Sequence, residues 1–123
     1  MGVTVLTSFT NSSIKKVGHT KSIKDLVRKQ ALLAKKARID GIVCSAKEIS
    51  LIKRKLGEDF MLVVPGIRLD EDNKNDQKRT MSPKNAIDEG ADLLVIGRPI
   101  TESNDPKNTI NKILKNIKND TKD

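Results

Sequence analysis

The stretch "LVVPGIR", residues 62–68, is the part of the sequence that says most about the fold. Its unbroken run of leucine and valine is typical of a strand covered on both faces, as strands of a parallel sheet are. The run ends at a glycine and then presents Arg68. The same order returns in "LLVIGRPI", residues 93–100, where Arg98 follows the glycine. Two strands with the same ending indicate equivalent, successive units of one parallel sheet.

Two further apolar runs precede these, "GVTVLT" at residues 2–7 and "GIVC" at residues 41–44. Each of the four runs is followed by a segment with the apolar spacing of a helix. Caps and end signals bound the predicted helices at Ser22 to Ala37, Ser45 to Gly57, Ser82 to Gly90, and Asp105 to Ile117. This alternation predicts an α/β fold of four consecutive β/α units, either an open doubly wound sheet or part of a (β/α)8 barrel.

No linker or low-complexity block interrupts these units, so we expect one domain over residues 1–118. The polar residues 119–123 have nothing to bury, which predicts a frayed tail. Ser45 and Glu48 have the spacing of a capping box, and Lys53 on the following helix is expected to be solvated. The buried face of the last helix is expected to consist of Ile110, Ile113, Leu114 and Ile117.

The chain has 123 residues and a formal net charge of +8, but its lysines are spread through every segment. With only Phe9 and Phe60 available to stack on bases, we expect no nucleic-acid partner. No apolar stretch is long enough to span a bilayer, and the start lacks the pattern of a signal peptide. The single Cys44 excludes an internal disulfide. These features predict a soluble protein of the cytoplasm without a membrane partner.

Chemistry is expected at the carboxyl ends of the strands, where both glycine-arginine pairs lie. Gly97 allows close approach of a ligand to the backbone, and Arg98 offers a planar fork that matches phosphate oxygens. Arg68 ends the neighbouring strand in the same way. Between the two, the polar loop "LDEDNKNDQKRTM" is longer than usual βα connections, and its Gln77 can donate an amide hydrogen bond. The pattern favours a phosphorylated metabolite, although a turn glycine and a solvated arginine explain either pair taken alone.

Other residues carry weaker signals. Thr7 ends the first apolar run and offers either a hydroxyl for a ligand or a local cap. His19 is the only histidine and is expected on the surface, so no metal-binding set can be assembled from the sequence. No dinucleotide or P-loop pattern is present, and spacing alone nominates no catalytic residue.

The order of the motifs resembles the C-terminal half of the orotidine 5'-phosphate decarboxylase family over essentially the whole chain. The motifs that carry this resemblance are "GVTVLTS", "DGIVCSAKE", "LVVPGIR", "DQKRTMSP" and "GADLLVIGRPIT". The resemblance implies half of a (β/α)8 TIM barrel and a homodimeric, cofactor-independent carboxy-lyase. Such enzymes convert orotidine monophosphate to uridine monophosphate and carbon dioxide in de novo pyrimidine biosynthesis, and need neither a metal nor an organic cofactor.

The resemblance also implies roles for single residues. Thr7 matches a substrate-contacting position, and four others match the positions that grip the phosphate: Arg68, Gln77, Gly97 and Arg98. The family's catalytic Asp-x-Lys-x-x-Asp motif, in contrast, is absent from these 123 residues. We therefore expect a truncated, phosphate-binding half that is inactive alone, with uncovered strand edges.

Several functions remain open at this point. The chain could be an inactive remnant, one subunit of a split enzyme that needs an N-terminal half, or a non-catalytic nucleotide-phosphate-binding module that hides its edges as a homo-oligomer. A sugar-phosphate decarboxylase or synthase of the same superfamily could share the "IGR" ending. The pair of "DQKR" and "PGIR" favours the nucleotide enzyme.

Overall fold

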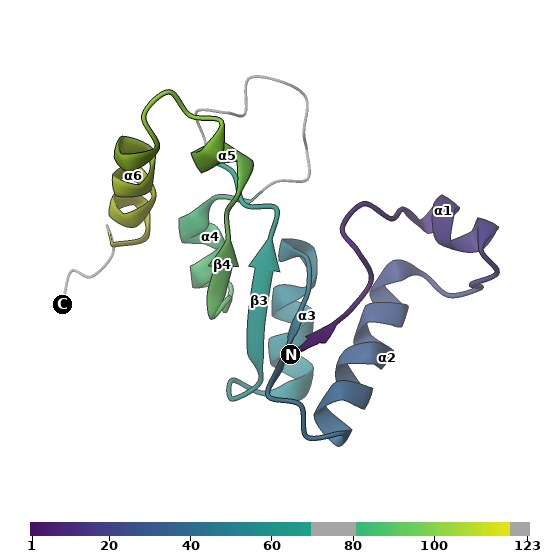
Figure 1. Cartoon of the computed structure of the whole chain (residues 1–123). Coiled ribbons are helices and arrows are strands. Elements are labelled where there is room, and N and C mark those ends of the chain that lie inside the picture. Colours follow the sequence, from purple (N-terminus) through teal and green to yellow (C-terminus); the bar gives the residue numbers. More distant parts are fainter. Residues whose placement is uncertain (70–80, 119–123) are drawn as a thin grey trace.

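The structure is a computed structural model that describes residues 1–69 and 81–118 (Figure 1). Its four strands form one parallel sheet in which sequence neighbours are also spatial neighbours, in the order β1-β2-β3-β4. The strands are β1 Gly2–Val3, β2 Gly41–Val43, β3 Met61–Pro65 and β4 Leu93–Val95. A parallel sheet with helical crossovers confirms the predicted repetition of β/α units.

Helices connect the strands and lie along one side of the sheet (Figure 1). They are α1 Asn11–Lys16, α2 Ile23–Lys36, the 3-10 turn η1 Ala46–Glu48, α3 Ile49–Leu56, α4 Pro83–Asp88, α5 Arg98–Thr101 and α6 Pro106–Lys118. The core lies between helices and strands, where Leu62 and Val64 of β3 and Ile49 of α3 are completely buried. Burial of these aliphatic side chains supplies the main driving force for the fold.

The other face of the sheet is uncovered in the described residues. The strand registers align Val3, Val43, Val63 and Leu93 in one row across this face. Val3 and Leu93, on the two edge strands, are 65% and 52% exposed, and Val43 and Val63 on the central strands are half-buried. A central strand of a complete parallel sheet would be buried on both faces. The predicted cover on both faces is therefore present on one face only within residues 1–69 and 81–118.

Most helix boundaries follow the local signals in the sequence. The hydroxyl oxygens of Ser22 and Ser82 accept hydrogen bonds from Asp25 N and Asn85 N at the starts of α2 and α4. Gly57 ends α3 with a φ of +88°, a backbone conformation that glycine adopts at little cost. These caps confirm the predicted positions of the helices.

Three local features differ from expectation. Ser45 does not cap a backbone N–H; its hydroxyl donates instead to the Glu48 carboxylate, and the segment begins as the 3-10 turn η1. Helix α1 was not expected, and it begins with a capping box between Thr10 and Ser13. On α6 only Ile113 is buried, whereas two of the predicted face residues, Ile110 and Leu114, are 41% and 47% exposed.

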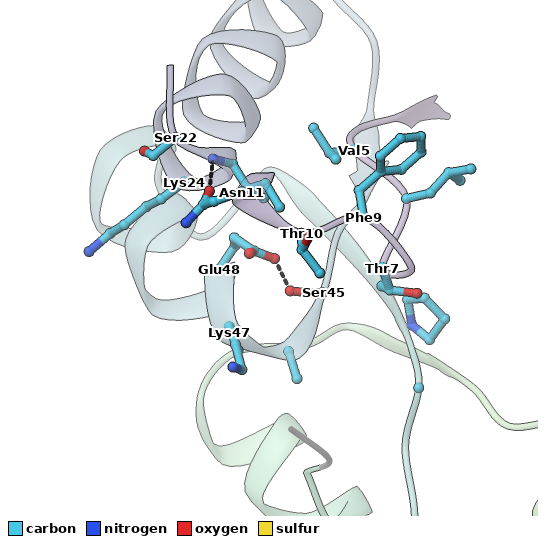
Figure 2. A pocket seen from close by; sticks show the side chains of 15 residues that line it. Val5, Thr7, Phe9, Thr10, Asn11, Ser22, Lys24, Ser45, Lys47 and Glu48 are labelled. Atoms are coloured by element: carbon cyan, nitrogen blue, oxygen red, sulfur yellow. Dashed lines mark hydrogen bonds between the residues drawn. The ribbon is translucent and has the colours of Figure 1, made fainter. Parts of the chain in front are cut away.

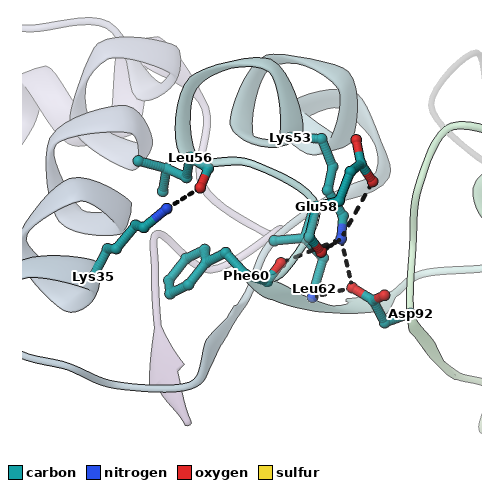
Figure 3. Close-up of polar contacts among 7 residues, drawn as sticks. All are labelled: Lys35, Lys53, Leu56, Glu58, Phe60, Leu62 and Asp92. Atoms are coloured by element: carbon teal, nitrogen blue, oxygen red, sulfur yellow. Dashed lines mark hydrogen bonds and ion pairs between the residues drawn. The ribbon is translucent and has the colours of Figure 1, made fainter.

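Lys53 is the clearest correction, because its side chain is buried rather than solvated (Figure 3). Its Nζ donates to the carboxylate of Asp92 at 2.9 Å, to Glu58 O at 2.9 Å and to Phe60 O at 3.3 Å. The same Asp92 oxygen accepts from Leu62 N at 2.8 Å. The spacing of residues along α3 could not reveal this burial, because all acceptors of the Lys53 side chain lie outside that helix. Lys53 thus ties α3 to the starts of β3 and β4.

We predict that Lys53→Met lowers the free energy of unfolding by about 3 kcal/mol, measured by urea unfolding. Methionine fills the space of the lysine stem but leaves the carbonyls and Asp92 without their shared donor. The loss lies at the low end for a broken buried ion pair because the Asp92 side chain keeps 40% exposure and water can solvate it. Lys55→Met, at an exposed position of the same helix, should change the value by less than about 0.5 kcal/mol. Equal losses in the two variants would contradict the structural role of Lys53.

Candidate functional site

A cavity of about 360 Å³ opens where β1, β2 and β3 end (Figure 2). Segments that follow these strands form its walls, together with the starts of α1 and α2. The polar lining residues are Thr7, Thr10, Asn11, Ser22, Lys24, Ser45, Lys47 and Glu48. A cavity at the carboxyl ends of parallel strands is the usual position of a ligand site in α/β proteins.

Hydrogen bonds hold the walls of the cavity in place. Thr4 Oγ1 donates to Val43 O at 2.7 Å, which ties the segment after β1 to β2. Asn11 Oδ1 accepts from Ile23 N at 2.9 Å, so the start of α1 is fixed to the start of α2. The Ser45 hydroxyl donates to Glu48 across the base of the cavity (Figure 2). The lining side chains therefore project from a backbone that is anchored on several sides.

The polar groups of the cavity favour an anionic or hydroxyl-rich ligand. Lys24 and Lys47 are exposed cations at the border of the cavity. The carboxylate of Glu48 accepts a hydrogen bond from the Ser45 hydroxyl (Figure 2). The hydroxyls of Thr7 and Thr10 can donate or accept. This combination provides recognition by hydrogen bonds and charge.

The nearby thiol is not a nucleophile. Cys44 is buried beneath the strand ends, with an exposed fraction of 2%. Desolvation by burial is the main cause that raises the pKa of the Cys44 thiol to about 12, and the charge of Glu48 adds to it. Because the thiolate is the reactive form, the neutral thiol at pH 7 is inert. This confirms the interpretation of Cys44 as a small buried side chain.

The two arginine-bearing strand ends lie next to each other at the same height. In the register of β3 and β4, Pro65 is aligned with Val95, and each arginine follows its aligned residue by three positions. Arg68 is half-buried, and its guanidinium donates to Ile67 O at 2.9 Å. Arg98 is exposed and begins the short helix α5. The two strand ends are therefore in register, whereas Arg68 lies in the segment after β3 and Arg98 lies in a helix.

The backbone beside Arg98 is accessible, and the backbone of Arg68 is anchored by hydrogen bonds. A side chain at Gly97 would meet no atom within 4 Å, which leaves open space beside this residue. Arg68 N donates to Met81 O at 3.2 Å, and Ile67 pairs with Met81, so the described ends of the loop at 69 and 81 are held together. These contacts fix the position from which the Arg68 side chain extends.

The structure brings some of the predicted site residues together and leaves others apart. Thr7 lines the cavity, together with Gly66 of the "PGIR" turn. Arg68, Gly97 and Arg98 are not part of its lining and lie at the ends of the neighbouring strands. Gln77 lies outside the described residues. That these groups hold one phosphate stays a prediction.

The cavity also includes residues that the sequence reasoning did not select. Thr10 and Asn11 belong to the unexpected helix α1, and Lys24 lies in the first turn of α2. Ser45 follows β2 after one residue, Cys44, and the sequence suggested only a capping role for it. Its position after a strand is the same signal that singled out Thr7. His19 is exposed, as expected.

Within residues 1–69 and 81–118, no group of three histidine, cysteine, aspartate or glutamate side chains could hold a metal ion. In the same part of the chain, no helix is both long and apolar enough to cross a bilayer.

Comparison with known proteins places this arrangement in a family context. The family model described as orotidine 5'-phosphate decarboxylase / HUMPS family matches residues 1–113. Orotidine 5'-phosphate decarboxylase of Coxiella burnetii is 50% identical over 118 residues, which are 96% of this chain and 50% of that protein. The enzyme of the same name from Legionella pneumophila is 44% identical and is covered to 51%.

Solved structures agree with the sequence relatives. The crystal structure of orotidine 5'-phosphate decarboxylase from Lactobacillus acidophilus matches with a TM-score of 0.79 at 32% identity, over 94% of this chain and 47% of that one. An uncharacterized conserved protein from Geobacillus kaustophilus matches with a TM-score of 0.73 at 29% identity, over 94% and 46% of the two chains. The chain thus spans about half the length of these proteins, and its sheet has the shape of half a TIM barrel.

Proposed function

This chain belongs to the orotidine 5'-phosphate decarboxylase / HUMPS family, and from that membership we propose that it binds the phosphate of a pyrimidine nucleoside monophosphate. The aligned strand ends of β3 and β4 support the proposal, because Arg68 and Arg98 each follow the aligned pair Pro65 and Val95 by three residues. Guanidinium groups form paired, charge-assisted hydrogen bonds with phosphate oxygens. In the family context this phosphate is that of orotidine or uridine monophosphate.

Each residue has a defined task in this proposal. Arg98 and Arg68 neutralise the phosphate, and Gly97 lets it approach the backbone where no atom fills the space. Gln77, on the loop between the two strands, adds an amide donor. Thr7 contacts the remainder of the nucleotide from the cavity that it lines. Metals and organic cofactors have no task in this binding.

The proposal separates binding from catalysis. The resemblance assigns the chemical step to an Asp-x-Lys-x-x-Asp motif, whose lysine protonates the carbon that loses carbon dioxide. No such motif occurs in the 123 residues. Binding of the phosphate can lower the barrier to decarboxylation only if other groups stabilise the transition state at the reacting carbon. We therefore propose that these 123 residues on their own act as the phosphate-binding half of a decarboxylase and do not decarboxylate.

Two further functions follow from the same observation. In a split enzyme, a separate half that carries the motif completes the barrel and restores pyrimidine biosynthesis in the cytoplasm. As a non-catalytic module, the chain binds a nucleotide monophosphate without turnover. In the split enzyme, the complementary half would cover the apolar face of the sheet on which Val3 and Leu93 are exposed.

Isothermal calorimetry with uridine monophosphate and with uridine tests the proposal. We predict measurable binding of uridine monophosphate at millimolar concentration and at least about 100-fold weaker binding of uridine, because uridine lacks the group that both arginines contact. Equal heats for the two ligands would show that the phosphate does not contribute to binding. Absence of heat with uridine monophosphate would overturn the proposal itself.

A further inference from the structure

We infer that the uncovered face of the sheet binds a second copy of this chain, so that two copies close an eight-stranded parallel barrel around a two-fold axis. The inference goes beyond the proposed function, because it concerns the assembly of the chain and not its ligand. It rests on the apolar face, on the two free edges and on the outward flanks of two helices.

The uncovered face is apolar over its whole described width. The central row of Val3, Val43, Val63 and Leu93 contains no polar side chain. Met61 extends the face on one side of this row, and Val95, which is 52% exposed, extends it on the other. A contiguous apolar surface of this kind is rare on a soluble monomer and marks an interaction site. The absence of charge on this face suits the tightly packed interior of a small barrel.

Both edges of the sheet are free in the described residues, since β1 pairs only with β2 and β4 only with β3. An unpaired edge presents backbone donors and acceptors that favour a further strand. In a two-fold arrangement, β4 of one copy pairs with β1 of the other, and symmetry repeats the same contact on the opposite side. The sheet has the shape of half a barrel, as its TM-score of 0.79 to a solved relative shows. Two such halves close without leaving an edge.

The flank of α2 that turns away from α3 carries Leu26 and Leu33, with the half-buried Gln30 between them. Leu32 lies on the side that faces α3, where it lines a groove with Ile52 and Leu56. Leu33 is the next residue, about 100° further around the helix, and it is 56% exposed. Leu26 lies on the same flank, two turns before Leu33. Ala34 of the same helix lies beside β1, since a Cβ at Gly2 would be 3.7 Å from the Ala34 Cβ.

Helix α6 lies at the other end of the row of helices (Figure 1), and it too carries exposed aliphatic side chains. Its side toward α4 is marked by Asn116, whose Oδ1 accepts from Lys84 N at 3.0 Å. Ile110 and Leu114 lie on the opposite flank, one turn apart, with exposures of 41% and 47%. In the closed barrel, this flank of one copy packs against the Leu33 flank of the other. One chain therefore carries both halves of the contact, which is the reason to assign the face to a second copy.

Size-exclusion chromatography with light scattering tests the inference on the full chain at micromolar concentration. We expect twice the mass of 13.6 kDa for the unchanged protein. Leu33→Asp should weaken the dimer by at least about 100-fold, because symmetry places the new charge at both contacts. Leu32→Asp is the matched control, since its neighbouring side chain is similarly exposed but faces α3, and it should leave the dimer intact.

Leu93→Asp provides a second variant on the sheet face, and circular dichroism verifies that each variant is folded. A short bis-maleimide linker should join two copies that carry Leu33→Cys and Leu114→Cys, but not copies with Leu32→Cys and Leu114→Cys; the buried Cys44 does not compete. A monomeric unchanged protein would overturn the inference, as would a dimer that survives both aspartate variants. Larger, open assemblies would overturn the closed barrel. Because none of these readouts uses a nucleotide, the proposed function can fail while the dimer stands, and the reverse.

Discussion

Arg98→Ala is expected to weaken the binding of uridine monophosphate by at least about 100-fold in calorimetry. The substitution removes the guanidinium at the end of β4 and leaves the phosphate oxygens without a charge-assisted partner. Arg98 is exposed at the first position of the short helix α5, and no hydrogen bond of its guanidinium within the described residues supports the fold. The loss should therefore appear in affinity and not in stability.

Two variants make this prediction specific. Arg98→Lys keeps the charge but loses the planar fork, so we expect an intermediate loss of affinity. Arg54→Ala removes an exposed arginine on α3 that donates to Ser50 O at 3.2 Å, and it should leave binding unchanged. If Arg98→Ala and Arg54→Ala bind equally well, the assignment of Arg98 to the phosphate is wrong.

A complementary half should convert this chain into a decarboxylase. We propose to co-express the chain with the part of the Coxiella burnetii relative that it does not match, since the two proteins are 50% identical over the shared half. The added half supplies the Asp-x-Lys-x-x-Asp motif that the resemblance assigns to the chemical step. We expect turnover of orotidine monophosphate to rise from the background of the uncatalysed reaction to a readily measured rate.

The controls of this experiment separate the two halves. The added half alone should be inactive because it lacks the strand ends to which we assign the phosphate. A hybrid in which the lysine of the motif is replaced by alanine should associate but not react. A hybrid with Arg98→Ala should lose activity mainly through a higher KM, since the grip on the phosphate is weakened. Stable association of the intact halves without any turnover would count against the split enzyme.

The repetitive part of the fold could be predicted from the sequence because it depends on local signals. The apolar runs located all four strands, and Ser22, Ser82 and Gly57 located the helix boundaries. The predicted first strand was too long, since β1 ends at Val3 and the chain then turns to form the cavity wall. Such a turn depends on the contact of Thr4 with Val43, which is distant in the sequence.

What could not be predicted depends on contacts between segments. Lys53 has the spacing of a solvated residue, and its burial results from acceptors that β3 and the start of β4 bring to it. Ile110 and Leu114 have the spacing of a buried face, but no described helix covers them. For the site, strand ends identified Thr7, Arg68 and Arg98 as candidates. The cavity residues Thr10 and Asn11 required knowledge of α1.

The most direct test of the central claim is the release of labelled carbon dioxide from carboxyl-labelled orotidine monophosphate by the 123-residue chain alone. We propose that the chain binds the phosphate but has no group that acts on the reacting carbon. We therefore expect uridine monophosphate to bind to the protein while the release of carbon dioxide stays at the background of the buffer. Release well above that background by the purified chain, lost in Arg98→Ala, would contradict the account.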